Sequence, residues 1–208
     1  MNIPIVFEDD YLLIVDKPAG LLCVPTPKNE SRTLTSILNQ DAKDRGLVYQ
    51  LYPCHRLDRD TSGLVIYAKS KAIEAKMADA FRNRQVSKKY FAFVHGKLAH
   101  AQGTISVAIE GKSAITKYKI IEQKSNYCVV EISPVTGRTN QIRIHFKGIG
   151  HPLVGEDKFV FRKDFALRAK RVCLHAQHLE FEHPQTAKLV TIEAPLAKDL
   201  QKFLEEHQ

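Results

Sequence analysis

Residues 53–70 read PCHRLDRDTSGLVIYAKS, and this stretch joins two unlike halves. Its second half, 64–68, is a short apolar run of the kind that a buried strand uses. Its first half, 55–62, is almost entirely charged or polar. Polar groups crowded against a buried strand must be solvated, paired or used, and Gly63 between the halves permits a backbone conformation closed to other residues. The stretch therefore predicts a buried strand with a functional site at its start.

Length and composition predict a single globular domain, with two small domains as the outside possibility. The 208 residues are 44% hydrophobic and 26% charged, which is ordinary for a soluble protein with a sizeable core. No apolar run approaches the roughly 20 residues that a membrane helix needs, and residues 1–5 lack a signal-peptide pattern. These features predict a cytoplasmic protein that does not engage a membrane.

The charge balance favours a polyanionic partner. Lysine and arginine outnumber aspartate and glutamate by 31 to 23, which gives a formal net charge of +8. Such an excess favours binding to nucleic acid but does not require it.

Metal binding and thiol chemistry are not predicted. The four cysteines, at positions 23, 54, 128 and 173, are too scattered for a zinc or redox motif and are expected to be free thiols. His175 and His178 have suggestive spacing, but they lie in a strand-like segment whose positions three apart point to opposite faces. We therefore expect no metal.

The pattern of elements predicts an α+β fold with a mixed, mostly antiparallel sheet flanked by helices and loops. Strand-like runs rich in β-branched and aromatic residues occur at 5–7, 12–15, 64–68, 90–94, 103–109, 114–121, 127–132, 174–181 and 189–192. Helical spacing and capping residues predict helices at 33–39, 71–84, 139–147, 162–170 and 196–206. Residues 41–46 are expected to form a surface loop, and Ser70 and either Ser31 or Thr33 are expected to be helix caps. One domain spans residues 1–208 in this interpretation.

A second polar motif, 136–145, reads TGRTNQIRIH. Thr139 is expected to cap the helix that follows. On that helix Arg138 and Arg143 would point about 140° apart, so they could not serve one ligand surface. Arg143 lies between two isoleucines, and a partly buried guanidinium there needs a paired anion.

The segment from His55 to Leu64 resembles the signature loop of the RluA-type pseudouridine synthase family, whose members isomerise uridine in RNA. Further blocks between Val15 and Ala176 resemble that family in the same order. The resemblance implies a single catalytic domain of the pseudouridine synthase fold, with no accessory RNA-binding domain ahead of it.

The resemblance also implies roles for individual residues. Asp58 corresponds to the essential catalytic aspartate, although from the residues alone Asp58 and Asp60 are more readily interpreted as turn carboxylates. Arg143 corresponds to the arginine that pairs with that aspartate. Tyr90 would stack on the target base, and Leu174 would pack near it.

Three further residues are expected to contact RNA: Arg56, which would fill the space left by a flipped uridine, and His55 and Arg138. The chain departs from the family pattern at Asn140, where histidine is common, at Glu156, which replaces aspartate, and at Phe159, where tyrosine is common.

These features together predict a cofactor-free, monomeric RNA pseudouridine synthase acting on ribosomal RNA, transfer RNA or both. Asp58 would either attack a ribose carbon or abstract a ribose proton, and the residues do not choose between these routes. A non-catalytic basic RNA-binding protein is the alternative from another class, and a metal-dependent nuclease is a third hypothesis.

Overall fold

The computed structural model describes residues 2–27, 30–160, 165 and 167–208. The chain forms two compact units. Unit 1 consists of Met1–Ser87 and His178–Ala194, and unit 2 consists of Lys88–Gln177 and Pro195–Gln208. The chain passes from unit 2 to unit 1 within strand β9 (Leu174–Glu182).

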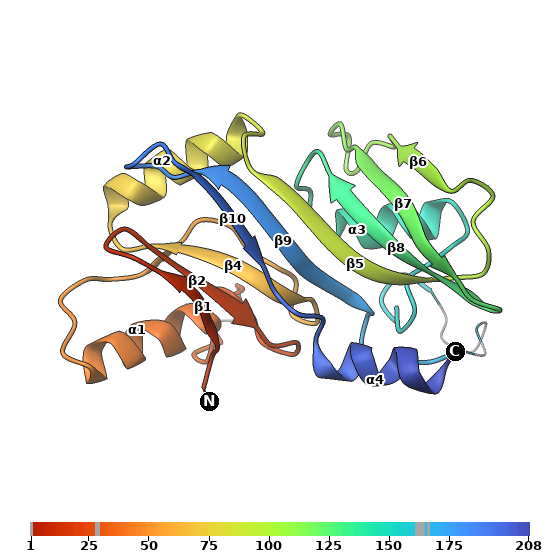
Figure 1. Ribbon diagram of the computed structural model, residues 1–208, viewed down its shortest axis with the longest axis horizontal. Helices are drawn as coiled ribbons and strands as arrows, with labels where there is room; N and C mark the ends of the chain where they lie inside the picture. The colour runs from red at the N-terminus through yellow and green to blue at the C-terminus, as the bar shows by residue number, and fades with distance from the viewer. Residues whose placement is uncertain (1, 28–29, 161–164, 166) are drawn as a thin grey trace. The chain divides into compact units, whose positions relative to one another are not determined.

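Unit 1 is built on an antiparallel meander. Strand β1 (Ile5–Glu8) pairs with β2 (Leu12–Lys17), and β2 pairs with β4 (Ser62–Ala68). The short strand β3 (Tyr52–Pro53) also pairs with β4, and β10 (Leu189–Glu193) pairs with β9. Figure 1 shows β1, β2 and β4 side by side. Every residue of β4 is buried, which confirms the apolar run predicted as a buried strand.

Helix α1 (Leu34–Asp44) begins at a capping box. The Thr33 hydroxyl accepts the N–H of Ser36, and the Ser36 hydroxyl accepts the N–H of Thr33. Thr33, one of the two predicted candidates, is therefore the N-cap of α1. The surface loop predicted for 41–46 is wrong over most of its length, because the helix continues to Asp44 and buries Ala42.

Helix α2 (Lys71–Arg82) begins at Ser70, whose hydroxyl accepts the N–H of Ile73 at 3.3 Å. This confirms the predicted cap. Ile73 and Met77 lie one turn apart on one helix face, and both are buried. They join the core of unit 1, whose other buried members are Leu12, Ile14, Leu64, Ile66, Ala68, Val86, Leu179, Phe181 and Ala194.

Unit 2 contains a second antiparallel meander. Strand β5 (Ser87–His95) pairs with β8 (Tyr127–Pro134), β8 with β7 (Thr116–Gln123), and β7 with β6 (Gln102–Ile105) (Figure 1). The strand predicted for 103–109 is too long, because β6 ends at Ile105.

Two helices complete the described part of unit 2. Helix α3 is Gln141–Gly148 and helix α4 is Lys198–Glu206. Leu200 and Phe203 of α4 pack into an aromatic cluster with Phe93 and Tyr127.

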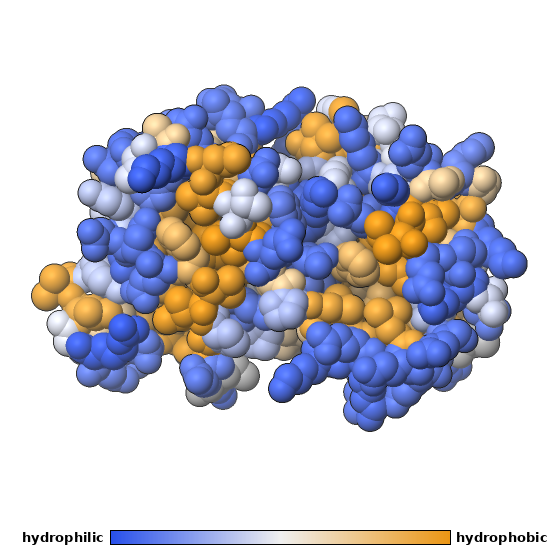
Figure 2. Space-filling model, in the orientation of Figure 1, coloured by the Kyte–Doolittle hydropathy of each residue, from blue (hydrophilic) through white to orange (hydrophobic). Residues whose placement is uncertain are grey.

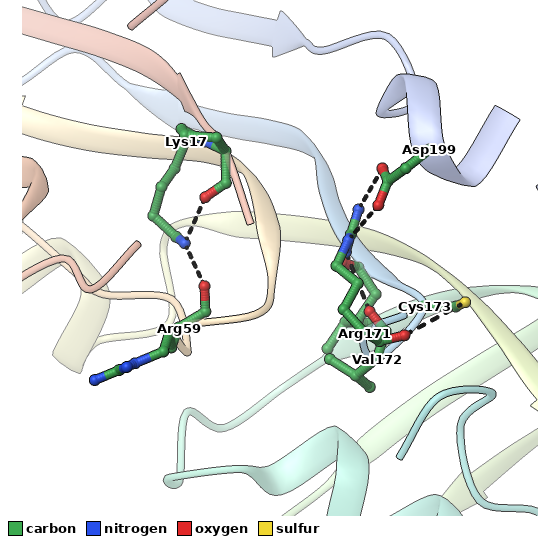
Figure 3. A network of polar contacts seen from close by, with 8 residues as sticks. Lys17, Arg59, Arg171, Val172, Cys173 and Asp199 are labelled. Carbon is green, nitrogen blue, oxygen red and sulfur yellow. Dashed lines mark hydrogen bonds and ion pairs between the residues drawn. The ribbon is translucent and has the colours of Figure 1, made fainter. Parts of the chain in front are cut away.

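A bidentate ion pair also holds α4. The guanidinium of Arg171 binds Asp199 at 2.6 and 2.9 Å (Figure 3). Of the helix predicted for 162–170, residues 162–164 and 166 lie outside the described part of the chain, and the prediction is wrong for residues 165 and 167–170, which are not helical.

These observations confirm the α+β class. Strands outnumber helices and do not alternate with them, and each ladder described within either unit is antiparallel. The prediction of one catalytic domain over residues 1–208 stays a prediction.

The surface of unit 1 includes some exposed apolar side chains. On the face shown in Figure 2, hydrophobic residues lie over β1, β2 and β10, with hydrophilic residues beside them. Leu189 of β10 is 70% exposed and Ile5 of β1 is 45% exposed. Across the described residues, none of the helices has both the length and the apolar character needed to cross a bilayer.

Candidate active site

The loop between β3 and β4 carries the polar half of residues 53–70. Asp58 is half-buried, between buried Leu57 and exposed Arg59. Its carbonyl accepts the N–H of Thr61 at 3.2 Å, which closes a turn. Gly63 follows with φ of 115°, a conformation that only glycine adopts readily. The predicted need for glycine is therefore confirmed, and the turn that precedes it begins at Asp58.

His55 and Arg56 have different surroundings. The His55 Nε2 accepts the N–H of Ile66 at 3.1 Å, and the imidazole ring lies 4.9 Å from the ring of Phe81. His55 therefore supports strand β4 and helix α2, whereas Arg56 is exposed. RNA contacts by either residue stay predictions.

The thiols near this loop are not set up as nucleophiles. Burial raises the pKa of Cys54 to about 12 and also raises the pKa of Cys23. A thiol is nucleophilic as the thiolate, so neither group is activated. Cys23, Cys128 and Cys173 are buried, as predicted, and all four cysteines are free.

Arg143 of α3 is the centre of a buried polar cluster in unit 2. Its Nε and Nη2 donate to the two carboxylate oxygens of Glu156 at 2.6 and 2.7 Å, and its Nη1 donates to Asn140 Oδ1 at 3.1 Å. The ring centroid of Phe159 lies 5.3 Å from its Cζ. These contacts use three of the five N–H groups of the guanidinium. The prediction that Arg143 is partly buried and needs an anion is confirmed, and Glu156 is such an anion.

Glu156 is held as a carboxylate by several donors. Its side chain is fully buried, and the backbone N–H groups of Lys158 and Phe159 donate to its Oε1 at 2.9 and 3.3 Å. Burial alone raises the pKa of Glu156, but the hydrogen bonds and charge of Arg143, with these N–H groups, outweigh it and hold the pKa below its usual value.

The three positions that depart from the family pattern meet at this cluster. Asn140, Glu156 and Phe159 all contact the Arg143 guanidinium. Asn140 is also the N-cap residue of α3, in a left-handed conformation with φ of 54°, and its side chain makes no capping bond. The prediction that Thr139 caps α3 is therefore wrong, and the Asn140 side chain turns to Arg143 instead.

Arg138 lies outside helix α3, which begins at Gln141. The predicted angle of about 140° between Arg138 and Arg143 assumed that both residues were helical, so it does not apply. Arg138 is exposed, and its Nε donates to the Ser113 carbonyl at 3.0 Å. Its predicted contact with RNA stays a prediction.

Gln141 binds the loop before α3 to strand β7. Its Oε1 accepts the Thr136 hydroxyl at 2.6 Å and the Arg138 N–H at 3.0 Å. Its Nε2 donates to the Ile115 carbonyl at 3.0 Å and to the Thr116 hydroxyl at 2.9 Å. Gln141 is 4% exposed, so these bonds replace the water that its amide would otherwise bind.

Replacing Gln141 by leucine is expected to lower the free energy of unfolding by about 3 kcal/mol. The change removes the acceptor of the Thr136 hydroxyl and the Arg138 N–H, and a buried group left unpaired costs about 1–3 kcal/mol. Chemical denaturation measures the loss. The matched change Gln102→Leu, at an exposed position of β6, is expected to alter stability by no more than about 0.5 kcal/mol. Equal losses in both variants would contradict the role of the Gln141 network.

Tyr90 and Leu174 belong to one hydrophobic cluster of unit 2. Leu174 is 3% exposed at the start of β9, and half-buried Tyr90 packs against the same cluster. Ile142 of α3 is a third member. The structure thus brings the two residues predicted near the target base into the core that also supports α3.

The predicted site residues divide between the units. Asp58, Arg56 and His55 lie in unit 1, and the others lie in unit 2. The pairing of Asp58 with Arg143 therefore stays a prediction.

The described residues contain no group of three or more His, Cys, Asp or Glu side chains arranged to hold a metal ion. His175 and His178 lie on strand β9, as predicted.

Sequence reasoning missed the contacts of Glu156 and Gln141. Each carried a usable signal, because a buried arginine requires an anion and a polar side chain beside Ile142 on a helix requires partners when it is buried. Neither signal names the partner, which lies 13 residues from Arg143 in one case and 25 from Gln141 in the other.

The chain resembles known proteins over most of its length. The family model described as RNA pseudouridylate synthase matches residues 11–147. A protein of Bacillus subtilis (strain 168) named "Uncharacterized RNA pseudouridine synthase YlyB" is 36% identical over 99% of this chain and 73% of its own. The "Dual-specificity RNA pseudouridine synthase RluA" of Pasteurella multocida (strain Pm70) is 34% identical over 93% of both chains.

Solved structures show the same fold. "Human RNA Pseudouridylate Synthase Domain Containing 4" matches with a TM-score of 0.82 at 23% identity, over 97% of this chain and 92% of that chain. "Human RNA Pseudouridylate Synthase Domain Containing 1" matches with a TM-score of 0.76 at 25% identity, over 99% of this chain and 94% of that chain. The family model and the curated relatives show that the chain belongs to the RNA pseudouridylate synthase family and is an isomerase.

Proposed function

We propose that this protein converts specific uridines of ribosomal or transfer RNA to pseudouridine, with Asp58 as the catalytic residue. The observation that carries the proposal is the 34% identity to a dual-specificity synthase over 93% of both chains. A relative from Nitrosomonas europaea named "Ribosomal large subunit pseudouridine synthase D" is 35% identical over 97% of this chain. These names support RNA as the substrate class.

Asp58 supplies the chemistry in this proposal. Breaking the glycosidic N–C bond of uridine builds positive charge on the ribose, and a carboxylate held close can stabilise that charge, bond to the sugar, or abstract a ribose proton. The freed uracil turns and rejoins the ribose through a ring carbon, which gives up a proton while the ring nitrogen released from the ribose takes one up, so the reaction consumes no second substrate. The half-buried position of Asp58 at the start of a turn supports this assignment, because the turn limits the motion of its backbone.

The remaining site residues act on the substrate. Tyr90 stacks on the target base, a contact worth about 1–3 kcal/mol, and Leu174 packs beside it. Arg143 pairs with Asp58 and keeps it ionised while Glu156 holds the other edge of the guanidinium. A uridine within a duplex must leave the stack to react, and Arg56 fills the space that it leaves.

Both units act together as one catalytic domain of a monomeric, cytoplasmic enzyme in this proposal. Arg56, His55 and Arg138 contact the RNA, and the excess of positive charge attracts its phosphates.

Purified protein incubated with ribosomal and transfer RNA transcripts tests the proposal. The expected result is conversion of uridine to pseudouridine at defined positions, with the RNA unchanged in length and with activity that survives a chelator. RNA binding without conversion would identify a non-catalytic binding protein, and shortened RNA would identify a nuclease.

Replacing Arg138 by glutamine is expected to weaken RNA binding and to reduce the slope of log K against log salt by about 1, because one phosphate contact is lost. Filter binding over a range of salt concentrations measures the slope. Arg82→Gln removes the same charge from α2, where Arg82 pairs with Asp79, and is expected to leave the slope unchanged. An equal reduction of the slope in the two variants would show that net charge, and not a contact at Arg138, sets the affinity.

A further inference from the structure

Lys17 is a fully buried lysine at the end of strand β2. Its Nζ donates to the carbonyl oxygens of Pro18, Leu21 and Arg59 at 2.9, 2.7 and 3.0 Å. Figure 3 shows the Lys17 side chain curving back so that its amine points toward the Arg59 carbonyl. An ammonium group has three donors, so three carbonyl acceptors match it. One of the three belongs to the residue that follows Asp58.

A second contact holds the residue before Asp58. The Leu57 N–H donates to Cys23 Sγ at 3.3 Å, and the Cys23 thiol lies 3.6 Å from the Leu57 carbonyl, to which it donates. The Gly20 N–H adds a further bond to the Arg59 carbonyl at 2.9 Å. Segment 17–23 is therefore bonded to the backbone on both sides of Asp58.

Neither side chain is placed to react directly. Cys23 is 1% exposed, and burial raises the pKa of its thiol. The Lys17 amine is directed at backbone carbonyls. Burying an amine costs free energy that only good acceptors offset, so an apolar side chain would fill this space at lower cost. Unlike an apolar side chain, Lys17 connects two loops, because its Nζ makes charge-assisted hydrogen bonds to carbonyls of both the 18–21 segment and the 57–59 loop.

We propose that Lys17 and Cys23 are positioning residues that hold the Asp58 carboxylate in register with its substrate. This inference rests on the proposed catalytic role of Asp58. Displacing a catalytic group by about 1 Å can cost about 100-fold in rate, and loss of either contact releases one side of the Asp58 backbone. The effect falls on the rate of the chemical step and leaves RNA binding intact, because neither side chain reaches the surface.

Replacing Lys17 by methionine tests the first contact. Single-turnover conversion at saturating enzyme is expected to slow by about 10–100-fold, with the Kd for the same RNA unchanged within about threefold. His183→Ala is the matched control. His183 is a buried residue of the same unit that binds Asp9 at 2.9 Å, away from the 57–59 loop. The His183→Ala variant is expected to have a lower melting temperature, with little change in the single-turnover rate of the folded protein.

Replacing Cys23 tests the second contact and does not require a buried charge to be removed. Cys23→Ala is expected to slow the chemical step by about tenfold, and Cys23→Ser is expected to restore most of the rate, because a hydroxyl can accept and donate the same two bonds. Losses in rate that only follow the loss of stability, with no difference between alanine and serine, would overturn the inference.

Asp58→Asn is measured beside these variants. If it retains activity, the proposed catalytic role of Asp58 fails, and the positioning role fails with it. If it is inactive while Lys17→Met and Cys23→Ala keep the normal rate, only the positioning role fails.

Discussion

Replacing Asp58 by asparagine is expected to slow conversion of uridine to pseudouridine by on the order of 10³-fold or more. Asparagine has nearly the same shape, so the turn between Asp58 and Thr61 is retained. It has no negative charge to stabilise a cationic ribose, and it is neither a nucleophile nor a base for the glycosidic step. Removing a residue that acts in the chemical step commonly costs this much. Single-turnover assays with a fixed RNA measure the rate, and the Kd for that RNA is expected to change little.

Asp60→Asn provides the matched control. Asp60 lies two positions away in the same half-buried loop and carries no catalytic role here. The control is expected to retain the rate within about threefold, because the asparagine amide has nearly the shape of the carboxylate and position 60 takes no part in the proposed chemical step. A full rate in Asp58→Asn, or equal losses in both variants, would remove Asp58 from the chemical step.

Local sequence patterns predicted most of the helices and strands, because interactions between residues close in the sequence determine where these elements form. Ser70 caps α2, and the buried run of β4 follows the quoted loop, because a capping hydroxyl and an apolar run act over a few residues. The errors occur where contacts of the folded chain, which no local pattern describes, set the bounds of a helix. Helix α1 continues through 41–44 because Ala42 is buried there. Helix α3 starts at Gln141 and not at a threonine cap because the Asn140 side chain binds Arg143.

The sequence predicted individual residues of the candidate site but not the contacts between them. The sequence indicated that Arg143 needs an anion, but a carboxylate 13 residues along a loop has no periodic relation to a helix. The bond from the Lys17 amine to the Arg59 carbonyl likewise spans 42 positions. Such contacts depend on the folded arrangement of loops, which periodicity and capping rules do not describe.

Replacing Glu156 by glutamine is expected to lower the free energy of unfolding by about 3–5 kcal/mol at neutral pH. The side chains of Glu156 and Arg143 are 0% and 8% exposed, so the change removes one charge from a buried bidentate pair, and breaking one partner of a buried pair typically costs this much. Chemical denaturation measures the loss. Asp199→Asn breaks a bidentate pair of similar geometry with Arg171, but the Asp199 side chain is 57% exposed, so we expect a loss of no more than about 1 kcal/mol.

The pH dependence separates the lost charge from lost packing. The pKa of Glu156 in the folded protein lies below its usual value of 4.5, so the ionised carboxylate stabilises the fold above about that pH and loses its effect as the pH falls through the folded pKa. The difference in stability between the native protein and Glu156→Gln is therefore expected to be largest near neutral pH and to shrink on acidification below about pH 4.5. A difference that stays constant with pH would mean that the shape of the side chain, and not its charge, holds Arg143. In that case the carboxylate of Glu156 would not be what fixes the guanidinium that we propose to pair with Asp58.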